Sequence, residues 1–99
     1  MDHPIHRVVS FVRKADFVLQ VQFADGITQI IDFRPVLRGE LYGPLADSTV
    51  FSRVRVDEEA GTLVWPNGAD FDPAILHDWP ERESELTAMA STWAQPVVR

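Results

Sequence analysis

The chain has 99 residues, 45% of them hydrophobic, with a formal net charge of -6, three tryptophans and no cysteine. This length supports a single hydrophobic core, the missing cysteines exclude disulfides and thiolate chemistry, and the acidic balance disfavours direct nucleic-acid binding. No apolar run approaches the roughly 20 residues that span a bilayer, and the first residues lack the regions of a signal peptide, so we expect a cytoplasmic protein without a membrane segment.

The first third of the chain predicts three strands. Residues 6–14 carry an apolar run, and residues 17–23 alternate apolar and polar side chains with the period of a strand buried on one face. Ala24-Asp25-Gly26 then predicts a short hairpin loop, followed by a third strand over residues 27–33. Because connections this short cannot make parallel crossovers, we expect an antiparallel meander.

The middle of the chain predicts a covering segment and a second hairpin. Residues 34–44 mix two prolines and two glycines with leucines, which indicates an irregular loop held down by its own apolar side chains. Asp47 is a good cap for a short helix over residues 48–53. Residues 54–56 and 62–65 predict a hairpin around an acidic turn.

Two helices are expected after this hairpin. Asp72 can cap a short helix that has Pro73 at its first position, where a missing amide donor costs nothing. Asp78 and Glu81 have the spacing of a capping box for a longer helix. One stripe of that helix contains Leu86, Met89, Ala90 and Trp93. The predicted class is α+β: a three-stranded meander plus a second hairpin, with short helices and a C-terminal amphipathic helix.

The order of these motifs resembles a known family. The matching motifs are Phe17-Val18-Leu19, Asp25-Gly26, Asp32-Phe33-Arg34-Pro35, Gly43-Pro44-Leu45 and above all Trp65-Pro66-Asn67-Gly68-Ala69-Asp70-Phe71. Over roughly residues 5–79 the chain resembles the DUF2442 family of small bacterial domains of unknown function. The resemblance implies an α+β domain over residues 1–79, with residues 80–99 as a C-terminal helix and tail.

The same resemblance bears on function. It implies similarity to the N-terminal domain of a bacterial regulator whose second half is a helix-turn-helix, and this chain carries no such second half. Family members also occur alone, often encoded beside a small protein of the DUF4160 type, in a layout like a toxin and antitoxin pair. No catalytic residue can be transferred, because the family has none established.

The run from Trp65 to Pro73 has two interpretations. In the structural one, Trp65 packs, Pro66-Asn67-Gly68 makes a tight turn, and Asp70 accepts hydrogen bonds from loop amides. In the functional one, the turn presents Asn67 and Asp70 beside an aromatic wall as a peptide or ligand site. Arg34, at the end of a predicted strand, either pairs with a carboxylate such as Asp70 or meets solvent.

Other chemical motifs are weak. Asp70 and Asp72 offer too few oxygens for a hard-cation site. His3 and His6, with Asp2, would bind a transition metal if the segment were helical, but Pro4 favours an extended chain. His77 is expected at a helix end as a surface or dipole contact. No serine lies in a nucleophile elbow, so we expect no catalytic, metal or cofactor site.

These observations favour a non-enzymatic protein-interaction module, with an antitoxin-like member of a bacterial pair as one form of it. Residues 51–99 hold nine acidic and four basic side chains, which would suit a basic protein partner, and a homo-oligomer stays open. The candidate partner-binding residues are Trp65, Asn67, Asp70, Arg34, Leu86, Met89 and Trp93. The alternatives are a small-ligand-sensing or enzymatic domain that uses the Trp65–Asp70 loop, and an accessory domain of a transcription regulator.

Overall fold

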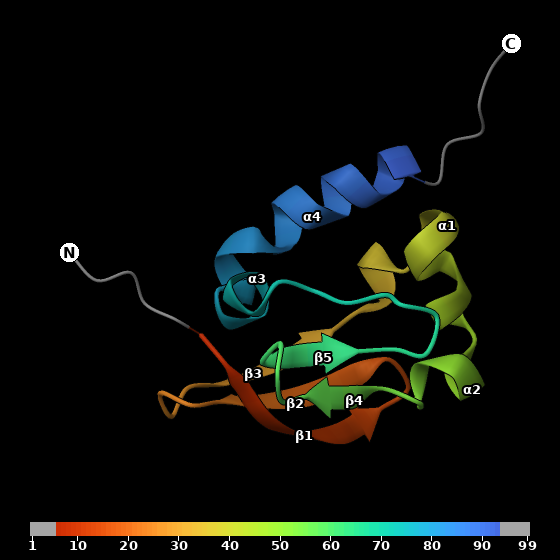
Figure 1. The fold of residues 1–99 in the computed structure, drawn as a ribbon. Helices are drawn as coiled ribbons and strands as arrows, with labels where there is room; N and C mark the ends of the chain where they lie inside the picture. The colour runs from red at the N-terminus through yellow and green to blue at the C-terminus, as the bar shows by residue number, and fades with distance from the viewer. Residues whose placement is uncertain (1–5, 94–99) are drawn as a thin grey trace, which may run out of the picture.

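Three antiparallel strands near the N-terminal end form the sheet on which the rest of the chain packs (Figure 1). The structure is a computed structural model that describes residues 6–93, apart from the side chain of Trp93. The strands are β1 (Val8–Ala15), β2 (Val18–Phe23) and β3 (Thr28–Asp32), paired in the order β1-β2-β3. The predicted meander is therefore confirmed.

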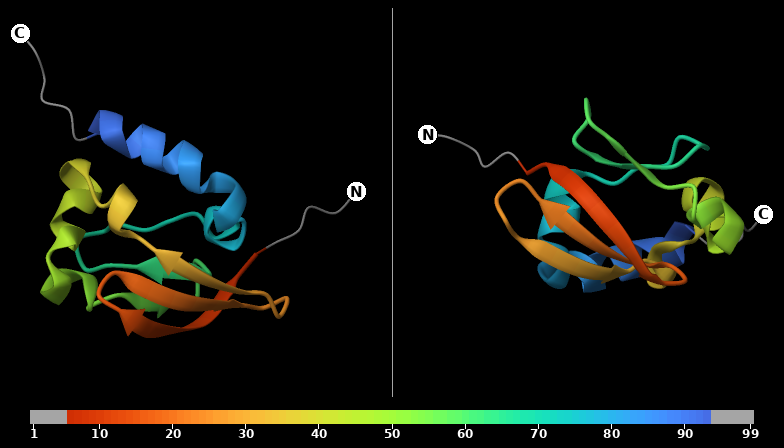
Figure 2. Two further views of the ribbon diagram at one scale, coloured as in Figure 1. Left: turned by 180° about the vertical axis from the view of Figure 1, so that it is seen from behind. Right: turned by 90° about the horizontal axis from the view of Figure 1, so that it is seen from below.

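The strand register divides this sheet into an inner and an outer face. Leu19 lies opposite Ile31 on the inner face, and both are fully buried. On the opposite side Gln20 lies between Val12 and Ile30, which are 51% and 64% exposed. A third row on this side joins Ala15, Val18 and Asp32. We use "outer face" for the other two neighbouring rows: Ser10, Val12, Gln20, Gln22, Thr28 and Ile30. The view from below looks onto it (Figure 2, right).

The turn between β1 and β2 differs from the prediction. Phe17, expected to begin the second strand, has a φ of 66°, which is rare for a residue with a side chain. Its carbonyl accepts a hydrogen bond from the Phe33 amide at 2.8 Å, and its ring packs edge-on against Phe51. These contacts hold a conformation that costs on the order of 1–3 kcal/mol by itself.

The second hairpin is confirmed in position and lies beside β1. It consists of β4 (Arg55–Asp57) and β5 (Thr62–Val64). The Asp57 carboxylate accepts the amides of Glu59 and Ala60, which fixes the acidic turn. The Val8 amide donates to the Gly61 carbonyl at 2.9 Å and joins this hairpin to the first sheet.

The segment expected to be an irregular covering loop is helical for most of its length. It contains η1 (Arg34–Val36), α1 (Gly39–Tyr42) and η2 (Gly43–Ala46), and the prediction of a loop is wrong there. Pro35 and Pro44 lie in the first turn of a 3₁₀ helix, where proline's fixed φ suits the turn and its missing donor costs nothing.

A short helix, α2 (Ser48–Phe51), follows, and it begins as predicted. The Asp47 carboxylate accepts the Thr49 amide at 2.9 Å, so the predicted cap is confirmed. Phe51, in the last turn of this helix, is almost fully buried.

The two last helices meet at a sharp corner. In α3 (Pro73–His77) the Asp72 carboxylate accepts the Ala74 amide at 2.8 Å, which confirms the predicted cap. The capping box for α4 (Trp79–Trp93) is wrong, because the Asp78 carboxylate contacts the His77 ring instead. Helix α4 runs above α3 and η1, on the far side of the core from the outer face (Figures 1 and 2).

The core is built around aromatic rings. Phe33 is fully buried, and its ring centroid lies within 6.0 Å of those of Phe51, Trp65, Phe71 and Trp79. The strands, the loops and α4 all contribute to this one cluster. Among the described residues, no helix is long and apolar enough to cross a membrane.

Candidate functional site

The loop from Trp65 to Asp72 is a closed turn between β5 and α3. The Trp65 amide donates to the Ala69 carbonyl at 2.9 Å, and the Gly68 amide donates back to the Trp65 carbonyl at 3.0 Å. Gly68 has a φ of +90°, which glycine adopts without strain. A bridge between Val64 and Asp70 continues the pairing of β5 beyond its end.

Trp65 anchors this loop from inside the core. It is 2% exposed, and its indole Nε1 donates to the Phe51 carbonyl at 2.9 Å. Its ring lies between those of Phe33, Phe51 and Phe71. The predicted aromatic wall is therefore internal, and Trp65 presents almost no surface to a partner in this conformation.

Asn67, not Asp70, holds the loop by its side chain. The Asn67 amide donates to the Leu41 carbonyl at 2.9 Å, and its oxygen accepts the Ala69 amide at 3.1 Å. Tyr42 adds a second tie, because its hydroxyl donates to the backbone carbonyl of Asp70 at 2.6 Å. The Asp70 side chain is exposed, so the predicted role of its carboxylate in binding loop amides passes to Asn67.

Arg34 does not reach this loop. Its guanidinium binds the Asp32 carboxylate, with an Nη2–Oδ2 distance of 2.7 Å. The pairing of Arg34 with Asp70 is therefore wrong. The hydrogen bond from Arg34 lowers the pKa of Asp32, and the same bond raises the pKa of Arg34. Because the Arg34 side chain is 65% exposed and the Asp32 side chain 37%, solvent screens this pair.

The predicted stripe on α4 is divided between core and surface. Leu86 is 7% exposed and Ala90 is fully buried, and both belong to the core cluster. Met89 is 47% exposed. The side chain of Trp93 lies outside the described part of the chain. The buried side of α4 is thus already packed against the protein's own core at Leu86.

A groove lies beside the loop, on the helical segment that Asn67 contacts. It has a volume of about 550 Å³ and is lined by residues 38–42. Tyr42 stacks on Phe71 with a centroid distance of 4.7 Å, which fixes one wall. Burial raises the pKa of the Tyr42 hydroxyl, and the nearby Asp70 charge adds to this. No sequence motif predicted the groove, because the segment was expected to be irregular.

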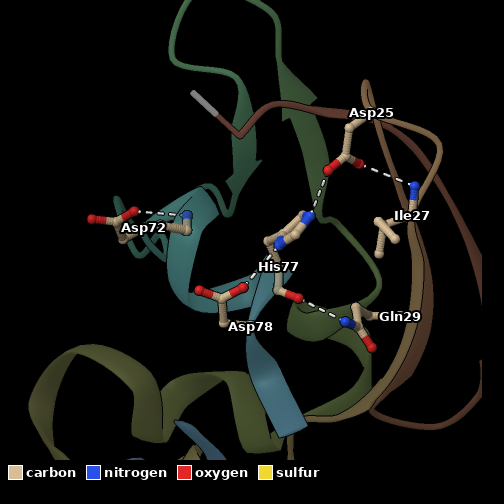
Figure 3. A network of polar contacts seen from close by, with 7 residues as sticks. Asp25, Ile27, Gln29, Asp72, His77 and Asp78 are labelled. Atoms are coloured by element: carbon tan, nitrogen blue, oxygen red, sulfur yellow. Dashed lines mark hydrogen bonds and ion pairs between the residues drawn. The ribbon is translucent and has the colours of Figure 1, made fainter. Parts of the chain in front are cut away.

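A second polar site, which the sequence did not predict, surrounds His77 at the end of α3 (Figure 3). Its Nε2 lies 2.7 Å from Asp25 Oδ2, and its Nδ1 lies 2.8 Å from Asp78 Oδ1. The His6 ring stacks on the His77 ring with a centroid distance of 3.8 Å and an interplanar angle of 18°. His77 is therefore not a simple dipole contact, and its side chain is only 15% exposed.

The electrostatics of this site follow from the two carboxylates. The hydrogen bond to Asp78 contributes most to raising the pKa of His77, and Asp25 adds to it, while partial burial opposes both. The pKa of Asp25 is lowered mainly by the Ile27 amide and then by His77. The bond to His77 likewise lowers the pKa of Asp78. A ring with a carboxylate at each nitrogen is best satisfied when both nitrogens donate.

The N-terminal residues considered as metal ligands from the sequence are not the group that forms this site. His3 and Asp2, which were considered with His6 as ligands, lie outside the described residues. The partner of His6 is instead His77, from the last third of the chain. Residues so far apart give no spacing pattern, so only the fold could bring them together.

One family model, described as a protein of unknown function (DUF2442), matches residues 8–81 of the sequence. The chain belongs to the DUF2442 family. No curated protein and no solved structure matches it. The DUF2442 match includes both sheets, the Trp65 loop, His77 and Asp78, and it ends in the first turn of α4.

Proposed function

We propose that this DUF2442 chain is a non-enzymatic protein-interaction module that binds its partner through the outer face of the three-stranded sheet. The observation that supports it most is the row Val12-Gln20-Ile30, in which both apolar side chains are more than half exposed. The neighbouring row is Ser10-Gln22-Thr28. Neither row contains a charged side chain; the next row on this side of the sheet ends at Asp32, which is paired with Arg34.

Such a surface favours a protein partner. Burying exposed valine and isoleucine releases water from apolar area, and the neutral polar side chains between them can be desolvated at a lower cost than charges. The centres of protein interfaces are poor in charged residues for the same reason.

The charge of the remaining chain indicates which partner fits. Two copies of a chain with a net charge of -6 repel each other, whereas a basic protein is attracted. We therefore expect a basic protein with an apolar strip rather than a second copy. The antitoxin-like member of a bacterial pair, which the family resemblance implies, would be a module of this kind.

The partner contacts predicted from sequence fit this proposal unequally. Trp65 and Leu86 are buried in the core, so they would act by holding the fold. Asn67, Asp70 and Met89 are exposed, and their part in binding stays a prediction.

Coexpression with the product of the neighbouring gene tests the proposal. We expect a stable complex, and a Val12→Lys/Ile30→Lys variant should weaken it by at least about tenfold, because it places two charges at the centre of the contact. Ile27→Lys is the matched control, since Ile27 is also an exposed apolar residue but lies in the turn between β2 and β3, outside the two rows. Unchanged affinity in the double variant would overturn the outer face as the site. A monomer that neither binds the neighbour nor rescues growth would overturn the antitoxin form.

A small-ligand-sensing function is a second candidate, favoured by the groove at residues 38–42. Its volume of about 550 Å³ lies within the range of small-molecule sites. A fragment screen by NMR tests this function. We expect shifts concentrated at Arg38, Leu41 and Tyr42 and lost in Leu41→Arg; shifts spread over the surface would contradict it.

A further inference from the structure

Three potential metal ligands meet where the N-terminal segment crosses the α3–α4 corner. His6, His77 and Asp78 each place one ligand atom within 4.8 Å of the others. They come from the segment before β1, the last turn of α3 and the junction with α4. All three residues are partly buried, unlike the acidic side chains that crowd the surface of α4.

A fourth residue completes the pattern of a metal-bound histidine. Such a histidine nearly always donates its second ring N–H to a carboxylate, a backbone carbonyl or a water molecule, which fixes the ring and makes it a better ligand. Asp25 has this position, with its Oδ2 2.7 Å from His77 Nε2. The other ring nitrogen, Nδ1, then faces the Asp78 carboxylate at 2.8 Å. The Ile27 amide holds Asp25 in turn, through a 3.0 Å hydrogen bond (Figure 3).

The donor set selects the class of ion. Two imidazoles and one carboxylate suit Zn²⁺, Co²⁺ and similar ions, whereas Mg²⁺ and Ca²⁺ prefer oxygen ligands. Three protein ligands leave a fourth position for water or another ligand.

We propose that His6, His77 and Asp78 bind one divalent transition-metal ion, with Asp25 positioning His77 from its second nitrogen. The ion takes the place of the proton that His77 Nδ1 shares with Asp78. It would also tie the N-terminal segment to the α3–α4 corner. This site lies apart from the outer face and does not depend on the proposed function.

Binding requires one rearrangement. A nitrogen lone pair lies in the plane of its ring, and the stacked His6 and His77 rings are nearly parallel, so they cannot both point at one ion as they stand. His6 must turn about its side-chain bonds. It precedes β1 and is held by no strand pairing of its own, so the turn leaves the sheet intact.

Co²⁺ is a suitable probe because its visible absorption reports the ligand set, and Zn²⁺ should displace it. With the full chain freed of metal by a chelator, we expect one Co²⁺ bound per chain. His77→Gln and His6→Ala should each weaken binding at least about tenfold, and Asp25→Asn should weaken it by about 10–100-fold. Glu58→Gln and His3→Ala are the controls, and neither should change the affinity.

The wild-type chain provides a test that does not depend on variants folding. On addition of Zn²⁺, the imidazole NMR signals of His6 and His77 should both shift, and with the same midpoint. Signals that stay unshifted at millimolar Zn²⁺ would overturn the site. Binding that survives His77→Gln but is lost in His3→Ala would also overturn it, because the ion would then lie in the N-terminal segment. If His77→Gln and His6→Ala weaken metal binding but Asp25→Asn leaves the affinity unchanged, the proposed positioning role of Asp25 is wrong.

Discussion

The Trp65–Asp72 loop and the His77 corner both connect parts of the chain that are distant in sequence, but they use different interactions. The loop is held by a buried indole and by hydrogen bonds to the carbonyls of Phe51, Leu41 and Asp70. The corner is held by an imidazole between the carboxylates of Asp25 and Asp78. The only titratable group in the first set is the Tyr42 hydroxyl, whose pKa is raised above its ordinary value of 10.0, whereas every bond in the second set depends on the protonation of His77 and the two carboxyls.

This difference distinguishes interactions that stabilise the fold under all conditions from interactions whose strength changes with pH, salt or metal ions. Burial of apolar rings and neutral hydrogen bonds changes little between pH 4 and 9, because no participant gains or loses charge. Contacts between an imidazole and two carboxylates change with pH, with salt and with a competing metal ion. We therefore expect substitutions in the loop to act on stability under all conditions, and substitutions at the corner to act conditionally.

The largest effect is expected from Trp65→Ala. The indole is 2% exposed and contacts the rings of Phe33, Phe51 and Phe71, so its removal leaves a cavity and takes one of two hydrogen bonds from the Phe51 carbonyl. The free energy of unfolding, measured in urea, should fall by about 3–5 kcal/mol at any pH. Trp65→Phe keeps part of the packing and should cost less. A loss below about 1 kcal/mol in Trp65→Ala would contradict the anchoring role.

A smaller effect is expected from Asn67→Ala. It removes one hydrogen bond to the Leu41 carbonyl and one from the Ala69 amide, which together are worth about 1–2 kcal/mol. Asp70→Ala is the matched control three residues further along the turn, since Tyr42 binds its backbone carbonyl rather than its carboxylate. The control should stay within about 0.5 kcal/mol of wild type. Equal losses in the two variants would show that the loop is held differently.

The sequence predicted the parts of the molecule whose causes are local. Strand alternation placed β2, and the Asp47 and Asp72 caps were correct because a cap involves residues only two apart. The helical turns between Pro35 and Ala46 do not follow from the sequence pattern, because proline and glycine are also typical of loops. In a first helical turn, proline marks a beginning.

The candidate site was harder to predict, since its contacts are not local. Asn67 and Asp70 are both candidates in the sequence, but only the fold places Leu41 and Tyr42 against them. It shows that Asn67 is bound through its side chain and Asp70 through its backbone carbonyl. For Arg34 the sequence left open a carboxylate such as Asp70 or solvent, and the structure pairs it with Asp32, two residues away. The His77 corner could not be predicted, because Asp25 and His6 belong to other elements.

Gly68→Ala should have a still smaller effect than Asn67→Ala. A Cβ at Gly68 would meet no atom within 4 Å, so the only cost is the positive φ of the turn, on the order of 1 kcal/mol. The urea midpoint should fall slightly, with an unchanged slope, because the folded surface stays the same. A larger loss of unfolding free energy would mean that the backbone of the turn cannot adjust to the new Cβ, despite the open space around Gly68.

The smallest effect at neutral pH, and the one that best separates the two regions, is expected from His77→Gln. The pKa of His77 is raised in the folded chain, so its contribution to stability is complete below its ordinary value of 6.5 and is lost as pH rises through the folded pKa. The pKa values of Asp25 and Asp78 are lowered, so their contributions are present above 3.8 and are lost as pH falls through their folded pKa values.

In chelator-treated protein, the difference in melting temperature between wild type and His77→Gln should therefore be largest between about pH 4 and 6.5 and should decline on both sides. Salt should reduce it throughout, because the side chains of Asp25 and Asp78 are 47% and 44% exposed to solvent. The same scan on Asn67→Ala should give a difference that is flat with pH. A flat difference for His77→Gln would mean that the corner is held by ring packing on Phe23 and His6 rather than by charge.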